Sequence, residues 1–308
     1  MGRAVVVHSP HARDTFERID RTLGWSVSRL CFEGPTDRLQ ETAAQQPAIF
    51  ACSMALYAAW RAELPEGDEI LCAAGHSLGE YGALVAAGAL SLEDGARLVS
   101  ARGQAMQEAA DHAPGGMCAV LGLDREILEA ICAEVSDRSA GASGIVVLAN
   151  DNAPGQQVLS GGNAALERAS ALARARGARR VVRLKVGGAF HSPLMAPAVP
   201  ALEAALRRLD APEADAAAGG LRPCKFPVVA NSSCDPLLEL RSIREELLRQ
   251  IAAPVRWVES IHAIADRSPD VWVDVGPGKV LGNLLTRILP DAPLLSLADL
   301  IDSPVAVH

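Results

Sequence analysis

The stretch AGHSLGEYGALVAAG, residues 74–88, holds a serine, Ser77, between two glycines. The run EILCAA before it is typical of a short buried strand, and GEYGALVAAGAL after it is typical of a helix. A G-x-S-x-G sequence between a strand and a helix places the serine at a sharp turn, where the next backbone N–H faces a developing oxyanion. Small residues also occur in such turns for packing alone, so this stretch leaves a purely structural role for Ser77 open.

Short β-rich runs alternate with longer amphipathic or alanine-rich stretches, which predicts an α/β protein. The order β, α, β, β, α, β predicts a small ferredoxin-like subdomain at 115–185. We expect this subdomain to be inserted in an α/β-hydrolase-like core with a parallel sheet, formed by 1–114 and 186–308. The run at 211–220 predicts a solvated loop. The predicted strands are 4–7, 69–75, 117–123, 144–150, 157–162, 179–186, 226–231 and 271–276, and the predicted helices are 47–64, 79–110, 124–136, 164–176, 197–209 and 239–264.

The composition favours a soluble protein of the cytoplasm. The net charge of −8 argues against general binding to nucleic acid or to an anionic membrane. The seven cysteines are scattered and never form C-x-x-C, which fits free thiols better than disulfides or a zinc site. No run approaches the roughly 20 apolar residues of a membrane span. We find no ligand cluster that points to a metal or to a bound redox cofactor.

A serine nucleophile needs a base, so the histidines are the next candidates. His76 is adjacent to Ser77, but neighbouring side chains diverge in a sharp turn. His191, in GGAFHSPLM, follows a predicted strand at a Gly-to-Pro loop, where catalytic side chains are commonly displayed. Such a histidine can equally be an ordinary surface residue, so the residues alone leave both interpretations open.

Several further motifs occur in a characteristic order: LVSARGQAMQEA, ANDNAPGQQVLSG, GGAFHSPLM, QIAAPVRWVESI and VDVGPGKVLGNLL. Together with GHSLGEYGALVAAGAL, their order and spacing resemble malonyl-CoA:acyl-carrier-protein transacylases and the acyltransferase domains of polyketide synthases. The resemblance implies that Ser77 is acylated and that His191 is its base. The reaction would move malonyl from coenzyme A to the thiol of an acyl carrier protein.

The resemblance also implies roles for residues around the dyad. Arg102, in SARGQAM, matches the arginine that pairs with the free carboxylate of malonyl, a task for which the planar guanidinium is suited. A backbone carbonyl in the APVRW region orients the histidine in this family, which here indicates the main chain of Arg256. Exposure on a solvated helix is the alternative for Arg102.

The same family comparison indicates cleft residues. Asn150 and Asn152, in ANDNAPGQ, match a loop that lines the cleft from the small subdomain, although an Asn-rich turn explains them equally well. His76 and Phe190 are expected to line the cleft from the other side. The GAFH quartet that ends at His191 resembles the HAFH form of malonyl-specific domains, with Gly188 in place of the first histidine.

A basic segment, RARGARRVVRLK at 174–185, is a candidate docking face for the carrier, because carriers in this family are acidic. A solvated basic surface is the alternative. The arginines proposed for docking are Arg176, Arg179, Arg180 and Arg183.

The N-terminal sequence departs from the family pattern. Members usually begin with a strand that runs into PGQGSQ, whose glutamine N–H joins the oxyanion hole, whereas this chain has AVVVHSPHARDTF. The N–H of Leu78 is one expected oxyanion donor, and Ser9 or His8 could supply the second. Loss of one such donor typically lowers the rate by about 10² to 10³.

Three functions remain after this comparison. The first is malonyl transfer to a carrier for fatty acid synthesis, a polyketide pathway or malonate decarboxylation. The second is an enzyme for an unusual acyl group or an editing acyl hydrolase. The third is a non-catalytic module that binds the carrier. The expected partners are malonyl-CoA and an acyl carrier protein.

Overall fold

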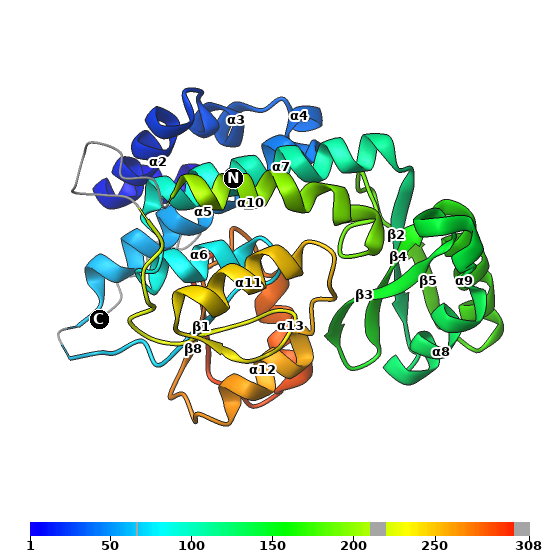
Figure 1. Ribbon diagram of the computed structural model, residues 1–308. Coiled ribbons are helices and arrows are strands. Elements are labelled where there is room, and N and C mark those ends of the chain that lie inside the picture. Colours follow the sequence, from blue (N-terminus) through cyan, green and yellow to red (C-terminus); the bar gives the residue numbers. More distant parts are fainter. Residues whose placement is uncertain (66, 210–219, 299–308) are drawn as a thin grey trace.

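The computed structural model describes residues 1–65, 67–209 and 220–298. A larger part of helices and short strands lies on one side of Figure 1, and a small sheet with helices lies on the other. The chain is an α/β protein with several sheets. The described helices are α1 (Arg3–His8), α2 (Pro10–Leu23), α3 (Val27–Glu33), α4 (Thr36–Gln40), α5 (Thr42–Glu63), α6 (Gly79–Ala86), α7 (Leu92–His112), α8 (Arg125–Val135), α9 (Asn163–Ala175), α10 (Val199–Arg208), α11 (Leu240–Gln250), α12 (Trp257–Ala265) and α13 (Val280–Ile288), with 3-10 turns η1 (Arg138–Gly144) and η2 (Pro193–Ala198). The strands are β1 (Ala73–Ala74), β2 (Gly115–Leu121), β3 (Val146–Ala153), β4 (Gln156–Gly162), β5 (Arg180–Arg183), β6 (Val228–Val229), β7 (Pro236–Leu237), β8 (Trp272–Asp274) and β9 (Leu294–Ser296).

The helices α5 and α7 pack against each other in the larger part. Ser91 begins α7, and its hydroxyl accepts a hydrogen bond from the N–H of Asp94 at 3.0 Å, which satisfies one of the free donors at the helix start. Gly95 then faces α5 so closely that a Cβ there would lie 2.8 Å from the ring of Phe50. At its other end α7 runs into β2, so one long helix links the larger part to the small sheet (Figure 1).

The small sheet is antiparallel, in the order β3-β4-β2-β5. Figure 1 shows α8 and α9 on the side of this sheet that faces away from the larger part. The helices and the sheet share a core that includes Leu128, Leu159 and Leu166, each fully buried. The second half of β3 contacts the larger part, because Asn150 forms a parallel bridge with Val255. The small unit thus has a core of its own and a backbone link to the rest.

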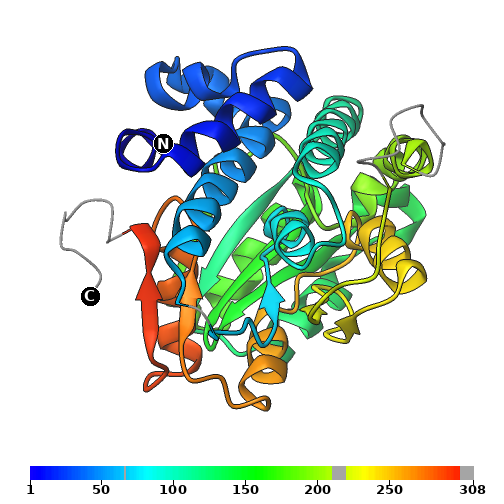
Figure 2. The same ribbon diagram turned by 90° about the vertical axis from the view of Figure 1, so that its left-hand side faces the viewer.

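The strands of the larger part form two separate sheets. β1 pairs in parallel with β6, β6 pairs with β7 in antiparallel fashion, and β8 pairs in parallel with β9. Figure 2 shows β8 and β9 (orange and red) apart from β1 (cyan). A cavity of about 870 Å³ is lined by residues of both β1 and β8. The parallel sheet predicted for the larger part is therefore interrupted between these two strands.

The predicted strand at 4–7 is wrong, because these residues belong to α1. Val5 is buried in the main core, whereas Val7 is 67% exposed. Ser9 separates α1 from α2 and caps α2 by accepting a hydrogen bond from the N–H of Ala12. Valine favours strands only weakly, so the packing of α1 against α2 and α5 decides its conformation.

Two predicted helices are each divided in the structure. The helix expected at 79–110 ends at Ala86 and restarts at Leu92, with Gly88 at φ 74° between them. The helix expected at 239–264 is broken between α11 and α12, where Pro254 lies. The predicted loop residues 211–219 lie outside the described residues. Within the described ranges, no helix has both the length and the apolar character needed to cross a membrane.

The core of the small unit gives a stability test. Leu128→Ala removes a fully buried side chain of α8, and we expect it to lower the free energy of unfolding by about 2–5 kcal/mol. Leu240→Ala, the same change at a position of α11 that is 43% exposed, is the control and should cost about 0.5 kcal/mol or less. Urea unfolding measures both, and equal losses would contradict the core assigned to α8.

Candidate active site

Ser77 lies at the sharp turn that its sequence predicts. It follows β1, precedes α6 and has a φ of 50°, a left-handed conformation that is unusual for serine. Gly75 makes this turn possible, since a Cβ at that position would lie 1.9 Å from the carbonyl carbon of Gly79. The two glycines of the G-x-S-x-G sequence therefore touch, and the serine stands between them.

Asn231, which follows β6, holds this turn from behind. Its Oδ1 accepts a hydrogen bond from the N–H of Ser77 at 2.6 Å, and its Nδ2 donates to the carbonyl of Gly75 at 2.8 Å. Its own N–H donates to Glu80 Oε2 at 3.2 Å. The sequence shows only an asparagine at the end of a predicted strand, so this role was not predicted.

His191 is the base candidate that the structure brings to Ser77. Its Nε2 lies 2.7 Å from Ser77 Oγ, and its Nδ1 lies 2.9 Å from the carbonyl oxygen of Gln250 and 3.2 Å from that of Ala253. Two carbonyl acceptors require a hydrogen on Nδ1, which leaves Nε2 as the acceptor for the serine proton.

The prediction that Arg256 orients His191 is wrong. The carbonyl of Arg256 instead accepts from the N–H of Ser260, one turn into α12. The helix α11 ends at Gln250, and the chain turns there, so carbonyls at the start of the turn face the imidazole. The family motif indicated the right segment, but only the path of the backbone decides which carbonyl points inward.

The environment of His191 keeps its ring neutral. Burial, followed by the positive charge of Arg102, lowers the pKa of His191 to about 3, although the carbonyls of Gln250 and Ala253 act in the opposite direction. Charge on His76 would also lower the pKa of His191. A neutral imidazole at physiological pH can accept a proton from the serine.

Arg102 projects from α7 into the same site and is 1% exposed. Its Nη2 donates to Ser77 Oγ at 3.1 Å and to Gln250 Oε1 at 2.9 Å, and its Nη1 donates to Gln46 Oε1 at 2.7 Å. Its guanidinium also lies over the ring of Tyr81, 5.6 Å from the centroid. The alternative of a solvated helix position is thus wrong, and the two glutamines were not predicted.

The cleft residues of the small unit are placed differently from one another. Asn152 Oδ1 lies 2.8 Å from His76 Nε2, and the His76 ring lies 5.3 Å from that of Trp257. Asn150 is buried in β3, where it makes the bridge to the larger part. Phe190 is half-buried and packs against both the main core and the small sheet. His76 and Asn152 therefore join the two parts beside Ser77.

The predicted oxyanion donors have separate outcomes. Among the described residues, the N–H of Leu78 donates to no protein acceptor, so it remains available beside Ser77. The prediction for Ser9 is not met, because its N–H donates to the carbonyl of Val5 at 2.9 Å within the α1–α2 junction. His8, the alternative, is an exposed residue at the end of α1. The N-terminal valines fold as a helix, which keeps both residues at this junction.

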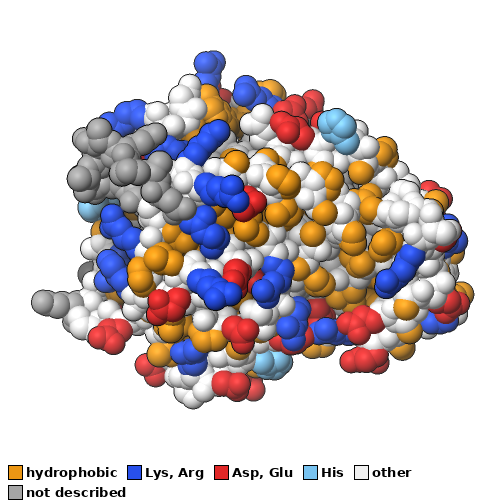
Figure 3. Space-filling model, viewed as in Figure 1, with side chains coloured by type: hydrophobic (Ala, Val, Ile, Leu, Met, Phe, Trp, Pro, Cys, Tyr) orange, Lys and Arg blue, Asp and Glu red, His pale blue; other side chains and the backbone are white. Residues whose placement is uncertain are grey.

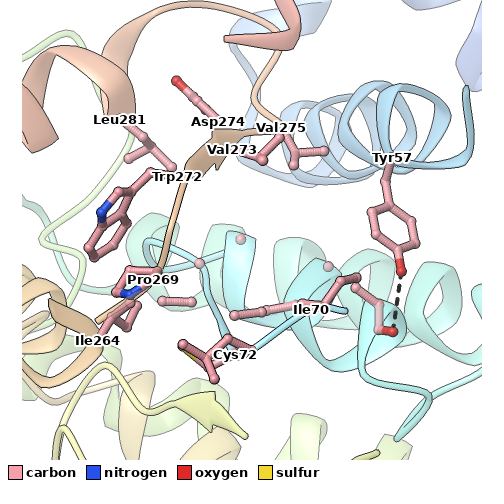
Figure 4. Close-up of a pocket in the computed structure, with 18 of the residues that line it drawn as sticks. Tyr57, Ile70, Cys72, Ile264, Pro269, Trp272, Val273, Asp274, Val275 and Leu281 are labelled. Carbon is pink, nitrogen blue, oxygen red and sulfur yellow. Dashed lines mark hydrogen bonds between the residues drawn. The ribbon is translucent and has the colours of Figure 1, made fainter. Parts of the chain in front are cut away.

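The cavity between β1 and β8 reaches the turn that carries the nucleophile, because Gly75, Leu78 and Gly79 line one end of it. Figure 4 shows its apolar wall, with Trp272 and Leu281 on one side and Ile70 on the other. The Tyr57 hydroxyl at its edge donates to the carbonyl of Ala86. The space behind the turn is therefore mainly hydrophobic.

The arginines predicted for carrier docking are all exposed on the small unit. Arg176 pairs with Glu134, and Arg183 donates to Asn163 Oδ1. On the face shown in Figure 3, however, lysines and arginines gather mainly over the larger part, around α10 and α11. The chain thus carries a second basic surface that the sequence did not indicate.

Glu80 is a fully buried carboxyl behind Ser77, and it generates a pH prediction. Burial raises the pKa of Glu80 from 4.5 to about 8, and the nearby Glu246 adds to the shift. When the pH rises above 4.5, the Glu80 carboxyl loses its proton in the unfolded chain but keeps it in the folded chain. The contribution of Glu80 to the free energy of unfolding is therefore complete below pH 4.5 and is lost as the pH rises through about 8.

Glu80→Gln imitates the protonated carboxyl and cannot titrate. We expect the wild type to lose free energy of unfolding relative to this variant between about pH 5 and about pH 9. Urea unfolding of both proteins at both pH values measures the change. Glu126→Gln, at an exposed position of α8, is the control. A difference between wild type and Glu80→Gln that does not vary with pH would contradict the expectation.

The chain is similar to known proteins over nearly its whole length. A model of the acyl transferase domain family matches residues 1–294. The malonyl CoA-acyl carrier protein transacylase of Bacillus subtilis is 38% identical over 299 residues, which cover 97% of this chain and 89% of that protein. The solved structure of the malonyl CoA-acyl carrier protein transacylase from Coxiella burnetii has a TM-score of 0.88 and 34% identity, and the match covers 99% of this chain and 92% of that one.

A further solved structure is a malonyl-transacylase in complex with a type II polyketide synthase acyl-carrier protein. It has a TM-score of 0.86 and 34% identity, and the match covers 96% of this chain and 90% of that one. Both the sequence and the fold are thus shared over nearly the whole length. The chain that brings Ser77, His191 and Arg102 together belongs to the acyl transferase domain family.

Proposed function

We propose that this enzyme transfers malonyl from coenzyme A to the phosphopantetheine thiol of an acyl carrier protein. The observation that carries the proposal is the convergence on one hydroxyl: Ser77 Oγ lies 2.7 Å from His191 Nε2 and 3.1 Å from Arg102 Nη2. A nucleophile, a neutral base and a buried guanidinium suit a carboxylated acyl group. The relatives named above are malonyl transacylases, one of them bound to a carrier protein.

In the first half-reaction, His191 Nε2 takes the proton of Ser77 Oγ as this oxygen attacks the thioester carbonyl. The N–H of Leu78 would stabilise the oxyanion. The carbon–sulfur bond then breaks, and His191 gives the proton to the departing coenzyme A thiolate. An ester between malonyl and Ser77 remains, with the malonyl carboxylate held by Arg102.

In the second half-reaction, the thiol of the carrier replaces that of coenzyme A. His191 takes the thiol proton, the sulfur attacks the ester carbonyl, and the Ser77 oxygen leaves with that proton. Both half-reactions therefore use the same groups, which suits an exchange between two similar thiols. The product would supply malonyl for fatty acid synthesis, a polyketide pathway or malonate decarboxylation.

The finer architecture belongs to the same proposal. The unit of 115–185 has the order β2-α8-β3-β4-α9-β5, and this order with its antiparallel sheet supports a ferredoxin-like subdomain. Residues 1–114 and 186–308 would form an α/β-hydrolase-like core, supported by the strand–serine–helix turn at Ser77. We place the protein in the cytoplasm, which suits its unpaired cysteines.

Two other functions are less well supported. An editing hydrolase would have little use for a buried arginine beside the nucleophile, and Arg102 lies there. A non-catalytic carrier-binding module would not need an imidazole whose unprotonated Nε2 lies at hydrogen-bonding distance from Ser77, as that of His191 does. An unusual acyl group is compatible with the site if it carries a carboxylate.

Intact mass after mixing the enzyme with malonyl-CoA tests the proposal. We expect one malonyl group on the wild type, none on Ser77→Ala, and transfer of the group when a phosphopantetheinylated carrier is added. His191→Gln should slow acylation by about 10² or more, because it removes the base. Rapid loss of the adduct in buffer without a carrier would indicate a hydrolase, and no adduct would favour the non-catalytic module.

Charge reversal tests the docking surface. Arg179→Glu with Arg180→Glu should raise the KM for the carrier by about tenfold and leave the KM for malonyl-CoA unchanged, because only the carrier would contact these residues. Arg207→Glu with Arg208→Glu, an exposed pair at the end of α10, is the matched control on the second basic surface. A larger effect of the control pair would move the docking face to the larger part.

A further inference from the structure

The hydroxyl of Ser77 makes two contacts of opposite sense. Because Nδ1 of His191 carries a hydrogen, Ser77 Oγ donates its proton to Nε2, at 2.7 Å. The same oxygen accepts a hydrogen bond from Arg102 Nη2, at 3.1 Å. The guanidinium therefore occupies a lone pair of the oxygen that has to attack the substrate.

Within the residues that the structure describes, the charge of Arg102 is compensated by amide and hydroxyl oxygens and not by an ion pair. Its acceptors are Gln46, Gln250 and Ser77, and in the described part of the chain its Nε has no hydrogen-bond partner. Two acidic groups act on it, first Tyr81 and then Glu80. Burial raises the pKa of the Tyr81 hydroxyl, and the raised pKa of Glu80, about 8, keeps that carboxyl largely protonated near neutral pH. A buried cation of this kind gains strongly from an incoming carboxylate.

Resting on the function proposed above, we propose that Arg102 also acts as a switch that lets the substrate carboxylate activate the Ser77–His191 pair. While no carboxylate is bound, the guanidinium holds the Ser77 hydroxyl and opposes positive charge on His191. When the carboxylate binds, it draws the guanidinium away from Ser77 Oγ and neutralises its charge. Acyl groups without a carboxylate leave the switch in its resting position.

The coupling acts through the pKa of His191. Besides burial, Arg102 and His76 lower the pKa of the imidazole, and the carbonyls of Gln250 and Ala253 raise it. A carboxylate near a cationic site typically shifts a neighbouring pKa by about 1–3 units. A base whose pKa moves closer to the working pH accepts protons more effectively. Selectivity for malonyl would then arise in the rate of acylation as well as in binding.

A probe that carries neither a carboxylate nor coenzyme A separates this coupling from substrate binding. Diisopropyl fluorophosphate phosphorylates an activated serine: an O–P bond forms, the P–F bond breaks, fluoride leaves, and His191 accepts the proton. The rate of labelling is measured against pH with sodium formate, which supplies a free carboxylate, and with sodium chloride at equal ionic strength. Mass analysis confirms that Ser77 is the labelled residue.

In wild type, formate should speed labelling near neutral pH by about tenfold and move the acidic limb of the profile upward by about one pH unit. Arg102→Met removes the charge but keeps the bulk. It should label faster than wild type without formate and should not respond to formate. Arg102→Lys, which keeps the charge, should retain a response. Arg97→Met, at an exposed arginine of the same helix, is the control and should behave as wild type.

The switch would be overturned if formate left the wild-type profile unchanged or slowed labelling. It would also be overturned if Arg102→Met had the same acidic limb as wild type. These outcomes are independent of malonyl transfer, because the phosphorylation needs no acyl thioester. Failure of malonyl-CoA to acylate Ser77, together with a formate response, would reject the proposed substrate and leave the coupling in place.

Discussion

The left-handed turn at Ser77 is the constraint on which the site depends. It requires the contact between Gly75 and Gly79, and Asn231 closes it from the side of β6 by binding both the Ser77 N–H and the Gly75 carbonyl. Residues from distant parts of the chain then meet at one oxygen: His191 after the small unit, and Arg102 from α7. A shift of the turn would displace the contacts of His191 and Arg102 together, because both residues contact Ser77 Oγ.

Gln250 connects these groups through one side chain and one carbonyl. Its Nε2 donates to the carbonyl of Ser77 and to Glu80, its Oε1 accepts from Arg102, and its main-chain oxygen holds His191. The site thus contains a buried cation, a neutral imidazole and a carboxyl with a raised pKa, joined by amide groups. Amides satisfy buried charges without adding a fixed anion, so a carboxylate from outside would have no bound anion to displace.

The three main side chains of this arrangement could be predicted from the sequence, but most of its main-chain groups could not. Ser77, His191 and Arg102 stand in motifs whose order indicates their roles, and the structure brings all three together. The sequence indicates Arg256 for the carbonyl that orients His191, but the carbonyls of Gln250 and Ala253 face the imidazole, because a main-chain group carries no residue signature. For the second oxyanion donor the sequence offers Ser9 or His8, but the Ser9 N–H is bound within the α1–α2 junction and His8 is exposed at the end of α1.

The small unit was the easiest to predict and the larger part the hardest. The strands of the small unit alternate with amphipathic helices over a continuous stretch, and nearby segments pair with each other. By contrast, β1 and β6 pair over two residues each and lie far apart in the chain. The valines at 4–7 favour a strand locally but form α1, since packing against α2 and α5 outweighs a weak preference.

The sequence by itself determined which residues are candidates for the chemistry, because a nucleophile, a base and a carboxylate-binding cation need particular side chains within particular local motifs. It also determined the alternation of helix and strand, which follows from the spacing of apolar residues. Only the tertiary structure decided which carbonyls hold His191, which amides surround Arg102 and that β1 and β8 do not pair with each other at the cavity. These depend on distances between segments that are remote in the chain, and no local pattern records them.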